Sequence, residues 1–461
     1  MMAPNKLPQL NRGFCIEYRG KCYSARQLEQ LLDALCLRLQ AMGLAPGMVL
    51  ASVGGQRWLN TLLLFALPRM GCVFFPVDPA LPEYSRRQQL QAARADMVLA
   101  DDACLEKLEA DLASRFPARE LEPDAVRLLL ATSGTQGQPR IVELSGRNLA
   151  ASVQASCKRL ALEESDTWLA CLPLHHIGGL SILLRCAHGG AKAVLMDRSD
   201  PPALKTALVQ SQVTHLSLVP AMLHRLLETH GEFCPPATLK AVVLGGAPAP
   251  GALVEAALQL GWPLCPSYGL TEAASQVATL FPPPQRWRPG CAGFPLAHVE
   301  IKLCEDTDVI SVRGPSIASH ARCVDGGRWK LTDEQGWLNT RDLGRMDSEG
   351  RLYVFGRNDD VFVSGGENIH PQLLEQELAH CPGVEQVAVS AFADATWGDA
   401  LAALYCGPAS AGQVNDWARR NLQGVFVPKR FFKVEALPRN TMGKLLRAEV
   451  KVLAQKLVQE E

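Results

Sequence analysis

The residues best equipped for chemistry lie in one short loop between two apolar segments. The loop combines three hydroxyl groups, an amide, two glycines and a cation, supplied by Thr132, Ser133, Gly134, Thr135, Gln136, Gly137 and Arg140. Backbone N–H groups at the glycines can converge on phosphate oxygens, while the hydroxyls add donors and the guanidinium adds charge. The loop therefore predicts a polyphosphate site. The alternative is an ordinary surface turn rich in Ser, Thr and Gly.

The flanking segments predict what positions this loop. Residues 126–131 are typical of a buried strand and residues 141–144 resume the apolar run, so the loop should be the turn of a hairpin. A P-loop is excluded, because Gly137 is followed by Gln138 and Pro139 rather than by Lys and Ser or Thr.

The composition excludes several classes of protein. With 46 basic and 47 acidic residues the net charge is -1, so no overall field gathers nucleic acid or an anionic membrane. The longest apolar runs, such as 62–67, fall far short of the about 18 residues of a membrane span. The 15 cysteines include no Cys-x-x-Cys spacing, which argues against structural zinc and favours a reducing compartment. We expect a cytoplasmic protein without nucleic-acid partners or membrane insertion. The composition leaves both a monomer and a homo-oligomer open.

Apolar periodicity predicts an α/β protein. Ser24 and Gln27 form a capping box ahead of an amphipathic helix that ends at Gly43. Short apolar runs then alternate with helix-like segments up to about residue 244, as in parallel sheets covered by helices. From Val299 onward, short strands separated by turns predict a β-rich subdomain.

A domain boundary is expected near Arg357. Beyond it the pattern predicts helices over 371–379, 414–422 and 445–458 and strands over 384–392 and 400–405, enough for a separate α+β domain. The predicted organisation is a large N-terminal domain of helix-covered sheets with the β-rich subdomain at 1–357, and a small α+β domain at 358–461.

Two further segments carry polar or glycine-rich residues directly after apolar runs, where ligands of α/β sheets gather. The first contains Gly245, Gly246 and Ala247 after the predicted strand 241–244. The second follows another short predicted strand and contains Ser267, Tyr268, Gly269, Thr271 and Glu272.

Together with the opening loop, these segments resemble the acyl-adenylate-forming (AMP-binding) superfamily, whose members make an acyl-AMP and then a thioester. The resemblance covers nearly the whole chain. It rests on TSGTQGQPR at 132–140, PLHHIGG at 173–179, GGAPAP at 245–250, SYGLTE at 267–272, GWLNTRD at 336–342, GRNDD at 356–360, SGGENI at 364–369 and LPRNTMGK at 437–444. It implies the acyl-CoA synthetase fold with a mobile C-terminal domain, and ATP, Mg²⁺ and coenzyme A as the small molecules used.

The resemblance also implies roles at the nucleotide. Lys444 corresponds to the lysine that bridges the substrate carboxylate and the α-phosphate, and Glu272 to the carboxylate that coordinates Mg²⁺. Asp342 and Arg357 correspond to the pair that holds the ribose hydroxyls. Tyr268 should cover the adenine ring. Each role has a structural alternative. Lys444 could be a solvated surface lysine, and Glu272 a solvated glutamate at the start of a helix. Asp342 and Arg357 could form a plain surface salt bridge, and Tyr268 could be a core aromatic.

In the C-terminal part, Asp359 corresponds to the hinge about which the small domain turns between the two half-reactions. Gly365 and Gly366 correspond to residues that let the pantetheine arm of coenzyme A pass close to the backbone, although a plain glycine turn is the alternative. The phosphate loop departs from the common pattern at Gln136 and Arg140, where a hydroxyl residue and a lysine are usual.

The acyl site is expected at the segment PLHHIGG, with a catalytic role for His176 at the pocket entrance and with His175 and Gly178 beside it. Residues 218–227, 244–248 and 267–279 resemble o-succinylbenzoate:CoA ligases of menaquinone biosynthesis, the pair Ser275–Gln276 above all. That substrate keeps a second carboxylate, so the pocket should offer cationic partners, for which Arg185 and Arg225 are candidates. For Arg225 an outward-facing charge on a helix is the alternative.

The expected activity is an ATP-dependent, AMP-forming acid–CoA ligase that takes a small carboxylic acid, with o-succinylbenzoate favoured. Three alternatives remain: a CoA ligase for another aryl or medium-chain acid, a stand-alone adenylation enzyme that loads a carrier protein, and a silent binding protein. The joint presence of Glu272, Asp342, Arg357 and Lys444 argues against the last.

Overall fold

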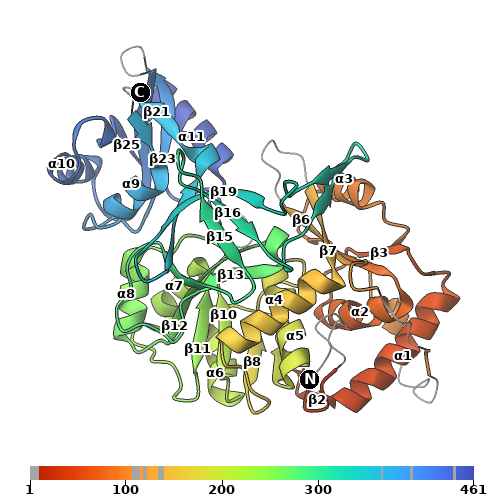
Figure 1. Cartoon of the computed structure of the whole chain (residues 1–461). Helices are drawn as coiled ribbons and strands as arrows, with labels where there is room; N and C mark the ends of the chain where they lie inside the picture. The colour runs from red at the N-terminus through yellow and green to blue at the C-terminus, as the bar shows by residue number, and fades with distance from the viewer. Residues whose placement is uncertain are drawn as a thin grey trace.

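The computed structural model describes residues 10–105, 115–117, 122–132, 140–364, 367–394, 398–439 and 443–460. Three sheets organise the described chain, and helices pack against them (Figure 1). The structure confirms the expected mixed α/β class.

The largest sheet has 13 strands in the order β15-β16-β19-β20-β14-β13-β12-β11-β10-β8-β9-β1-β2. Its strands are β1 Cys15–Tyr18, β2 Lys21–Ser24, β8 Thr167–Ala170, β9 Lys192–Leu195, β10 His215–Leu218, β11 Ala241–Leu244, β12 Leu264–Leu270, β13 Ser275–Thr279, β14 Cys291–Pro295, β15 Glu300–Leu303, β16 Val309–Arg313, β19 Leu338–Met346 and β20 Leu352–Arg357. The run β9-β8-β10-β11-β12 is parallel, and the strands from β13 to β20 are antiparallel. The predicted β-rich region is therefore continuous with the parallel sheet.

The second sheet has seven strands in the order β18-β17-β7-β6-β4-β3-β5. They are β3 Val49–Ser52, β4 Val73–Pro76, β5 Met97–Leu99, β6 Val126–Thr132, β7 Arg140–Ser145, β17 His320–Arg322 and β18 Arg328–Lys330. As predicted, β6 and β7 form an antiparallel pair, with Thr132 opposite Arg140 at the mouth of the connecting loop.

Eight α-helices belong to these two sheets in the described chain: α1 Ala25–Ala41, α2 Arg57–Met70, α3 Glu83–Ala93, α4 Gly146–Arg159, α5 Ile177–Gly189, α6 Pro201–Gln210, α7 Pro220–His230 and α8 Gly251–Gln259. The predicted capping box is present at α1, where Ser24 Oγ accepts from the Gln27 N–H and the Gln27 side chain accepts from the Ser24 N–H. Four strands of the parallel run, β8 to β11, are almost wholly buried, as expected for strands covered on both faces.

The C-terminal unit, residues 362–460, has its own sheet and core. It contains β21 Phe362–Ser364, β22 Glu367–Ile369, β23 Gln386–Asp394, β24 Gly398–Cys406, β25 Arg430–Lys433, α9 Pro371–Leu378, α10 Ala411–Asn421 and α11 Arg447–Glu460. Along β24, Leu401 and Tyr405 pack with α9 and α10, while Leu404 packs with Val450 of α11. This period of two places helices on both faces of the sheet. In Figure 1 the unit, in blue, stands beside β19.

One expected detail differs. The segment Ser267–Leu270 does not follow a strand but continues β12, because it pairs with β13 after β12 has left the parallel run. Glu272 lies just beyond, in the short 3-10 helix η3 Thr271–Ala273. Within the described residues, none of the helices combines the length and the apolar character that crossing a membrane requires.

Candidate active site

Three predicted nucleotide ligands meet at the junction of β19, β20 and β12. Asp342 and Arg357 are register partners of the antiparallel pair, and Nη1 of Arg357 lies 3.4 Å from Oδ1 of Asp342. Tyr268 donates its hydroxyl proton to Oδ2 of Asp342 over 2.5 Å. A carboxylate beside a guanidinium suits a pair of vicinal hydroxyls, because one group accepts hydrogen bonds and the other donates them.

The carboxylate of Asp342 also interacts electrostatically with the C-terminal unit. Burial raises the pKa of Asp342, and the hydrogen bond from Tyr268 and the charges of Arg357 and Lys444 oppose that rise. Burial together with the neighbouring Asp342 raises the pKa of Tyr268 well above its ordinary value. The phenol therefore stays protonated and remains a donor, and Lys444 lies within electrostatic range of Asp342.

A close contact explains how Lys444 reaches this place. The preceding residue, Gly443, has a φ of +72° and lies against Ala221 at the start of α7. A Cβ added to Gly443 would stand 2.4 Å from Cβ of Ala221, so only glycine allows the loop to seat. The structure thus brings Lys444 from a loop ahead of α11, as predicted, to the large sheet.

Glu272 is a half-buried carboxylate beside the same group of residues. Burial raises the pKa of Glu272; the charges of Arg357 and Arg140 oppose the rise, and Asp342 reinforces it. A desolvated carboxylate oxygen is a good ligand for a hard divalent cation, which would replace the lost hydration. The residues therefore fit the expected Mg²⁺, with Glu272 as the protein ligand.

The phosphate loop itself lies largely outside the described residues, and this applies to Ser133, Gly134, Thr135, Gln136 and Gly137. Its two ends are described: Thr132 Oγ1 donates to the carbonyl of Arg140 over 3.4 Å. The guanidinium of Arg140 stacks over the indole of Trp329, 5.1 Å from the ring centroid. The cation–π contact with Trp329 of β18 thus helps to hold Arg140, which stands where a lysine is usual.

The glycine-rich segment after β11 allows two backbones to approach. A Cβ on Gly245 would stand 2.9 Å from the carbonyl oxygen of Ser267, and Gly246 has a φ of +82°. Ala247 follows in the same turn. On the partner strand, a Cβ on Gly269 would stand 2.1 Å from the carbonyl oxygen of Ser275. These positions hold the predicted adenine segments side by side.

The two predicted histidines lie together at the start of α5. Their ring centroids are 4.5 Å apart, and Nε2 of His175 lies 3.6 Å from Oδ2 of Asp78. Burial lowers the pKa of His176 to about 4; burial also lowers the pKa of His175, against the opposing charge of Asp78. Both rings are therefore neutral near pH 7. Gly178 follows in the first turn of α5, where its added Cβ would meet only Leu172 at ordinary contact distance.

Arg185, on α5, is a buried cation. Its side chain is 2 % exposed; Nη2 donates to Oγ of Ser275 over 3.0 Å, and the guanidinium stands over Trp168. Among the described residues, Nε of Arg185 has no hydrogen-bond partner, and no carboxylate is among the charges that act on this guanidinium. Burial lowers its pKa to about 10, so it remains charged. Ser275 pairs with Leu270, which places this cation at the turn that carries Glu272.

The structure places Arg225 at the surface of the described chain. This residue lies on the exposed face of α7, where Nε donates to the carbonyl of Ala221 one turn earlier over 3.3 Å. The spacing along α7 turns Leu223 and Leu226 into the core and Arg225 away from it. Arg225 is therefore not among the buried groups of the acyl segment, and its role in the acyl pocket stays a prediction.

The predicted hinge residue, Asp359, lies in η4 Asn358–Asp360, between β20 and β21. Its carboxylate contacts Arg357 and Arg341, 3.6 Å and 3.3 Å away. The tunnel residues Gly365 and Gly366 lie outside the described residues, so their role stays a prediction.

Comparisons with known proteins show to which family the chain belongs. The AMP-binding enzyme family matches residues 9–319, and the AMP-binding enzyme C-terminal domain matches residues 373–444. The chain belongs to the AMP-binding enzyme family. A 2-succinylbenzoate–CoA ligase of Bacillus mycoides (strain KBAB4) is 32% identical over 450 residues, 94% of each chain.

Solved structures of a Bacillus subtilis o-succinylbenzoate CoA synthetase are also similar to this AMP-binding enzyme. The complex with the acyl-adenylate OSB-AMP superposes with a TM-score of 0.84 at 31% identity and covers 95% of this chain and 94% of that one. The complex with ATP and magnesium superposes with a TM-score of 0.83 at 30% identity and covers 94% of this chain and 95% of that one. A double mutant bound to the product analogue OSB-NCoA gives 0.69 at 30% identity, with 94% of each chain covered.

Sequence reasoning missed Asp78, Ser181 and Arg341 in this AMP-binding enzyme. Asp78 follows β4 by two residues, so the rule that ligands gather after parallel strands could have found it. Ser181 Oγ lies 3.4 Å from Oγ of Ser275 and completes the polar group around Arg185. Arg341 gave no sequence signal as a partner of Asp359, because only the fold brings them together.

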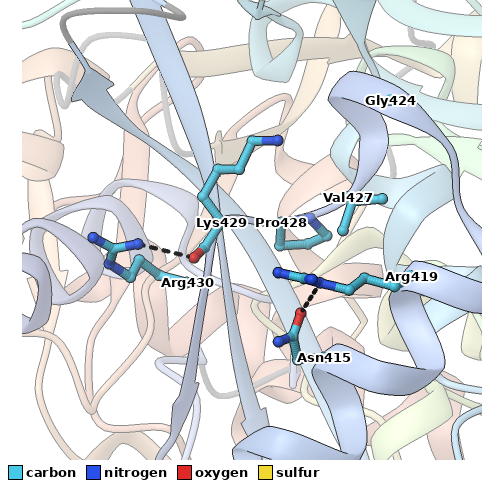
Figure 2. A pocket seen from close by; sticks show the side chains of 7 residues that line it. All are labelled: Asn415, Arg419, Gly424, Val427, Pro428, Lys429 and Arg430. Carbon is cyan, nitrogen blue, oxygen red and sulfur yellow. Dashed lines mark hydrogen bonds between the residues drawn. The ribbon is translucent and has the colours of Figure 1, made fainter.

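A separate cationic pocket lies on the C-terminal unit of this AMP-binding enzyme, between α10 and the segment before β25. It encloses about 500 Å³, and Figure 2 shows Arg419, Lys429 and Arg430 among its lining residues. Nε of Arg419 donates to Oδ1 of Asn415 over 3.1 Å. This pocket shares no residue with the nucleotide group around Asp342.

Proposed function

We propose that this AMP-binding enzyme is an ATP-dependent acid–CoA ligase whose acid is o-succinylbenzoate, used in menaquinone biosynthesis. The observation that carries the choice of acid is the buried Arg185, which has no acidic partner among the described residues. A buried cation needs an anion, and o-succinylbenzoate retains one carboxylate after the other has been activated. The names of the similar ligases support the same acid.

In the first half-reaction, a carboxylate oxygen of the acid attacks the α-phosphorus of ATP, the bond to the β-phosphate oxygen breaks, and pyrophosphate leaves. Two anions must meet, so the barrier is largely electrostatic. Lys444 is placed to stabilise the charge that develops between carboxylate and α-phosphate. Asp342 and Arg357 hold the ribose, and Tyr268 covers the base. Glu272 would hold Mg²⁺, and the cation would neutralise charge on the phosphates.

In the second half-reaction, the thiolate of coenzyme A attacks the acyl carbonyl, the bond to AMP breaks, and AMP leaves with its oxygen. We propose that the C-terminal domain, 358–461, turns about Asp359 relative to the domain 1–357 between the two steps. The orientation described here suits the first step, because Gly443 seats on Ala221 and Lys444 faces Asp342. The higher TM-scores for the relative's acyl-adenylate and ATP complexes than for its product-analogue complex support this assignment.

The acyl segment provides an uncharged wall. His175 and His176 are uncharged near pH 7, because burial lowers both pKa values. His176 is suited to line the pocket entrance and to orient the acid. We also propose that the enzyme works in the cytoplasm, since all 15 cysteines are unpaired.

The test is a panel of carboxylic acids assayed for pyrophosphate release with and without coenzyme A. O-succinylbenzoate should have a kcat/KM well above benzoate, hexanoate and octanoate, because a monoacid leaves the buried cation unpaired. Preference for a monoacid would overturn the substrate and leave the ligase chemistry standing. Acylation of a phosphopantetheinylated protein, with free coenzyme A inactive, would instead make the enzyme a carrier-loading adenylation enzyme.

A further inference from the structure

Two consecutive aspartates at the junction of the two parts of the chain face opposite ways. Oδ2 of Asp359 lies 3.3 Å from Nη1 of Arg341 and 3.6 Å from Nη2 of Arg357, both in the N-terminal part. Oδ2 of Asp360 lies 3.6 Å from Nε of Arg447, in the C-terminal unit. Asp359 thus pairs with the N-terminal part, whereas the next residue, Asp360, pairs with the C-terminal unit. A rotation at this point would separate Asp359 from its partners and leave the contacts of Asp360 intact.

The contacts of Asp360 belong to a tightly bonded part of the C-terminal unit. Gln372 of α9 donates to Oδ2 of Asp360 over 2.8 Å. Arg447 opens α11 and forms a two-pronged ion pair with the half-buried Glu375, with Nη2 2.7 Å from Oε2. Because Arg447 lies three residues after Lys444, Asp360 and the lysine loop move together.

The partner on the other side, Arg341, has an unusual backbone. Its φ is +60°, a left-handed conformation that costs energy for any residue except glycine. Its N–H donates to Oδ1 of Asn339 over 2.9 Å, which helps to hold this turn. The turn aims the guanidinium at Asp359 and leads directly into Asp342. A side chain kept at a strained position next to the ribose site indicates a contribution from that side chain.

We propose that Arg341 and Asp359 form a latch that holds the C-terminal unit in the orientation in which Lys444 faces Asp342. Arg341 is then a positioning residue for acyl-AMP formation. Arg357 extends the latch to the nucleotide, because one of its nitrogens lies 3.4 Å from Asp342 and the other lies 3.6 Å from Asp359. This inference rests on the proposed two-step function.

The latch should be weak enough to open in every cycle. The Arg341 and Asp359 side chains are 43% and 41% exposed, so water and salt screen the pair. Exposed ion pairs shift an equilibrium by about 2- to 5-fold, and loss of the latch should change the population of the adenylation orientation by that factor.

The experiment compares the two half-reactions in the full-length enzyme with Arg341→Gly, which removes the guanidinium and fits the positive φ. Acyl-AMP formation, measured as the pre-steady-state burst of pyrophosphate, should fall about 2- to 5-fold. Thioester formation from isolated acyl-AMP and coenzyme A should be unchanged or faster. Arg341→Lys should restore most of the burst rate, and 0.5 M KCl should bring the wild type close to Arg341→Gly.

A matched control uses Arg19, which also has a left-handed φ, of +50°, and an exposed ion pair, with Asp197 at 2.8 Å, at the other end of the large sheet. Arg19→Gly should leave both half-reactions unchanged. Equal losses in both half-reactions of Arg341→Gly, or no change in either, would overturn the latch. Failure of the wild type to adenylate any acid would instead overturn the proposed function, so the two failures are distinguishable.

Discussion

Gly443 and Ala221 join the two parts of the chain at a contact that admits no side chain on the glycine. Gly443 has a φ of +72°, and an added Cβ would approach Cβ of Ala221 to 2.4 Å. The contact seats the loop that carries Lys444 on the first turn of α7. The position of the lysine therefore depends on the size of two side chains as well as on its own charge.

Replacement of this glycine should affect only the first half-reaction. Gly443→Ala adds both a clash and backbone strain, so we expect acyl-AMP formation to slow by about tenfold or more, as about 1.4 kcal/mol of lost docking would produce. Thioester formation from isolated acyl-AMP should persist. Gly412→Ala is the control, because no atom lies within 4 Å of its added Cβ.

A second-site change checks the cause of that loss. Ala221→Gly removes the opposing methyl group, so Gly443→Ala combined with Ala221→Gly should recover part of the burst rate. If the double variant is no faster than Gly443→Ala alone, backbone strain at Gly443 rather than the contact with Ala221 limits docking.

The charge of Lys444 should contribute to adenylation and to little else. Lys444→Ala is expected to lower acyl-AMP formation by about 10²-fold or more, the scale of losing a preorganised charge at a transition state. Supplying acyl-AMP should restore thioester output, measured with coenzyme A by mass spectrometry. An equal loss in both half-reactions would argue against a domain that turns between them.

Arg185 should decide between diacids and monoacids. Arg185→Met removes a buried cation, so kcat/KM for o-succinylbenzoate should fall. The loss should correspond to about 2–3 kcal/mol of transition-state stabilisation, the value of a lost charge-assisted hydrogen bond. Benzoate and hexanoate should be nearly unaffected, and the melting temperature should be maintained or raised, because the cation has no acidic partner among the described residues. Arg225→Ala, at an exposed cation, is the comparison. A diacid-specific loss there would return the role to Arg225.

His176 should make the fold less stable in acid. Burial lowers its pKa to about 4, below the value of about 6.5 in the unfolded chain, so the unfolded state binds the proton more readily. The stabilising contribution is thus complete above pH 6.5 and is lost as the pH falls from 6.5 towards 4. The difference corresponds to about 3 kcal/mol at most. The urea midpoint of His176→Phe should fall less than that of the wild type between pH 7.5 and 5; identical pH profiles would show that the ring titrates normally.

The sequence by itself determined the local elements and the residue types of the site. The capping box of Ser24 and Gln27, the hairpin around the phosphate loop and the helices and strands after Arg357 follow from short-range patterns, which depend on neighbours along the chain. The resemblance of the motifs to the AMP-binding superfamily likewise identified Asp342, Arg357 and Lys444 as candidates.

Only the tertiary structure decided which charges meet and which are buried. Arg185 and Arg225 are both helical arginines in the sequence, yet the packing of α5 buries one guanidinium beside Ser275 and that of α7 leaves the other in water. The pairing of Arg341 with Asp359 and the seat of Gly443 on Ala221 join residues far apart in the chain. Such contacts depend on how strands and helices are placed in space, which periodicity along the chain does not specify.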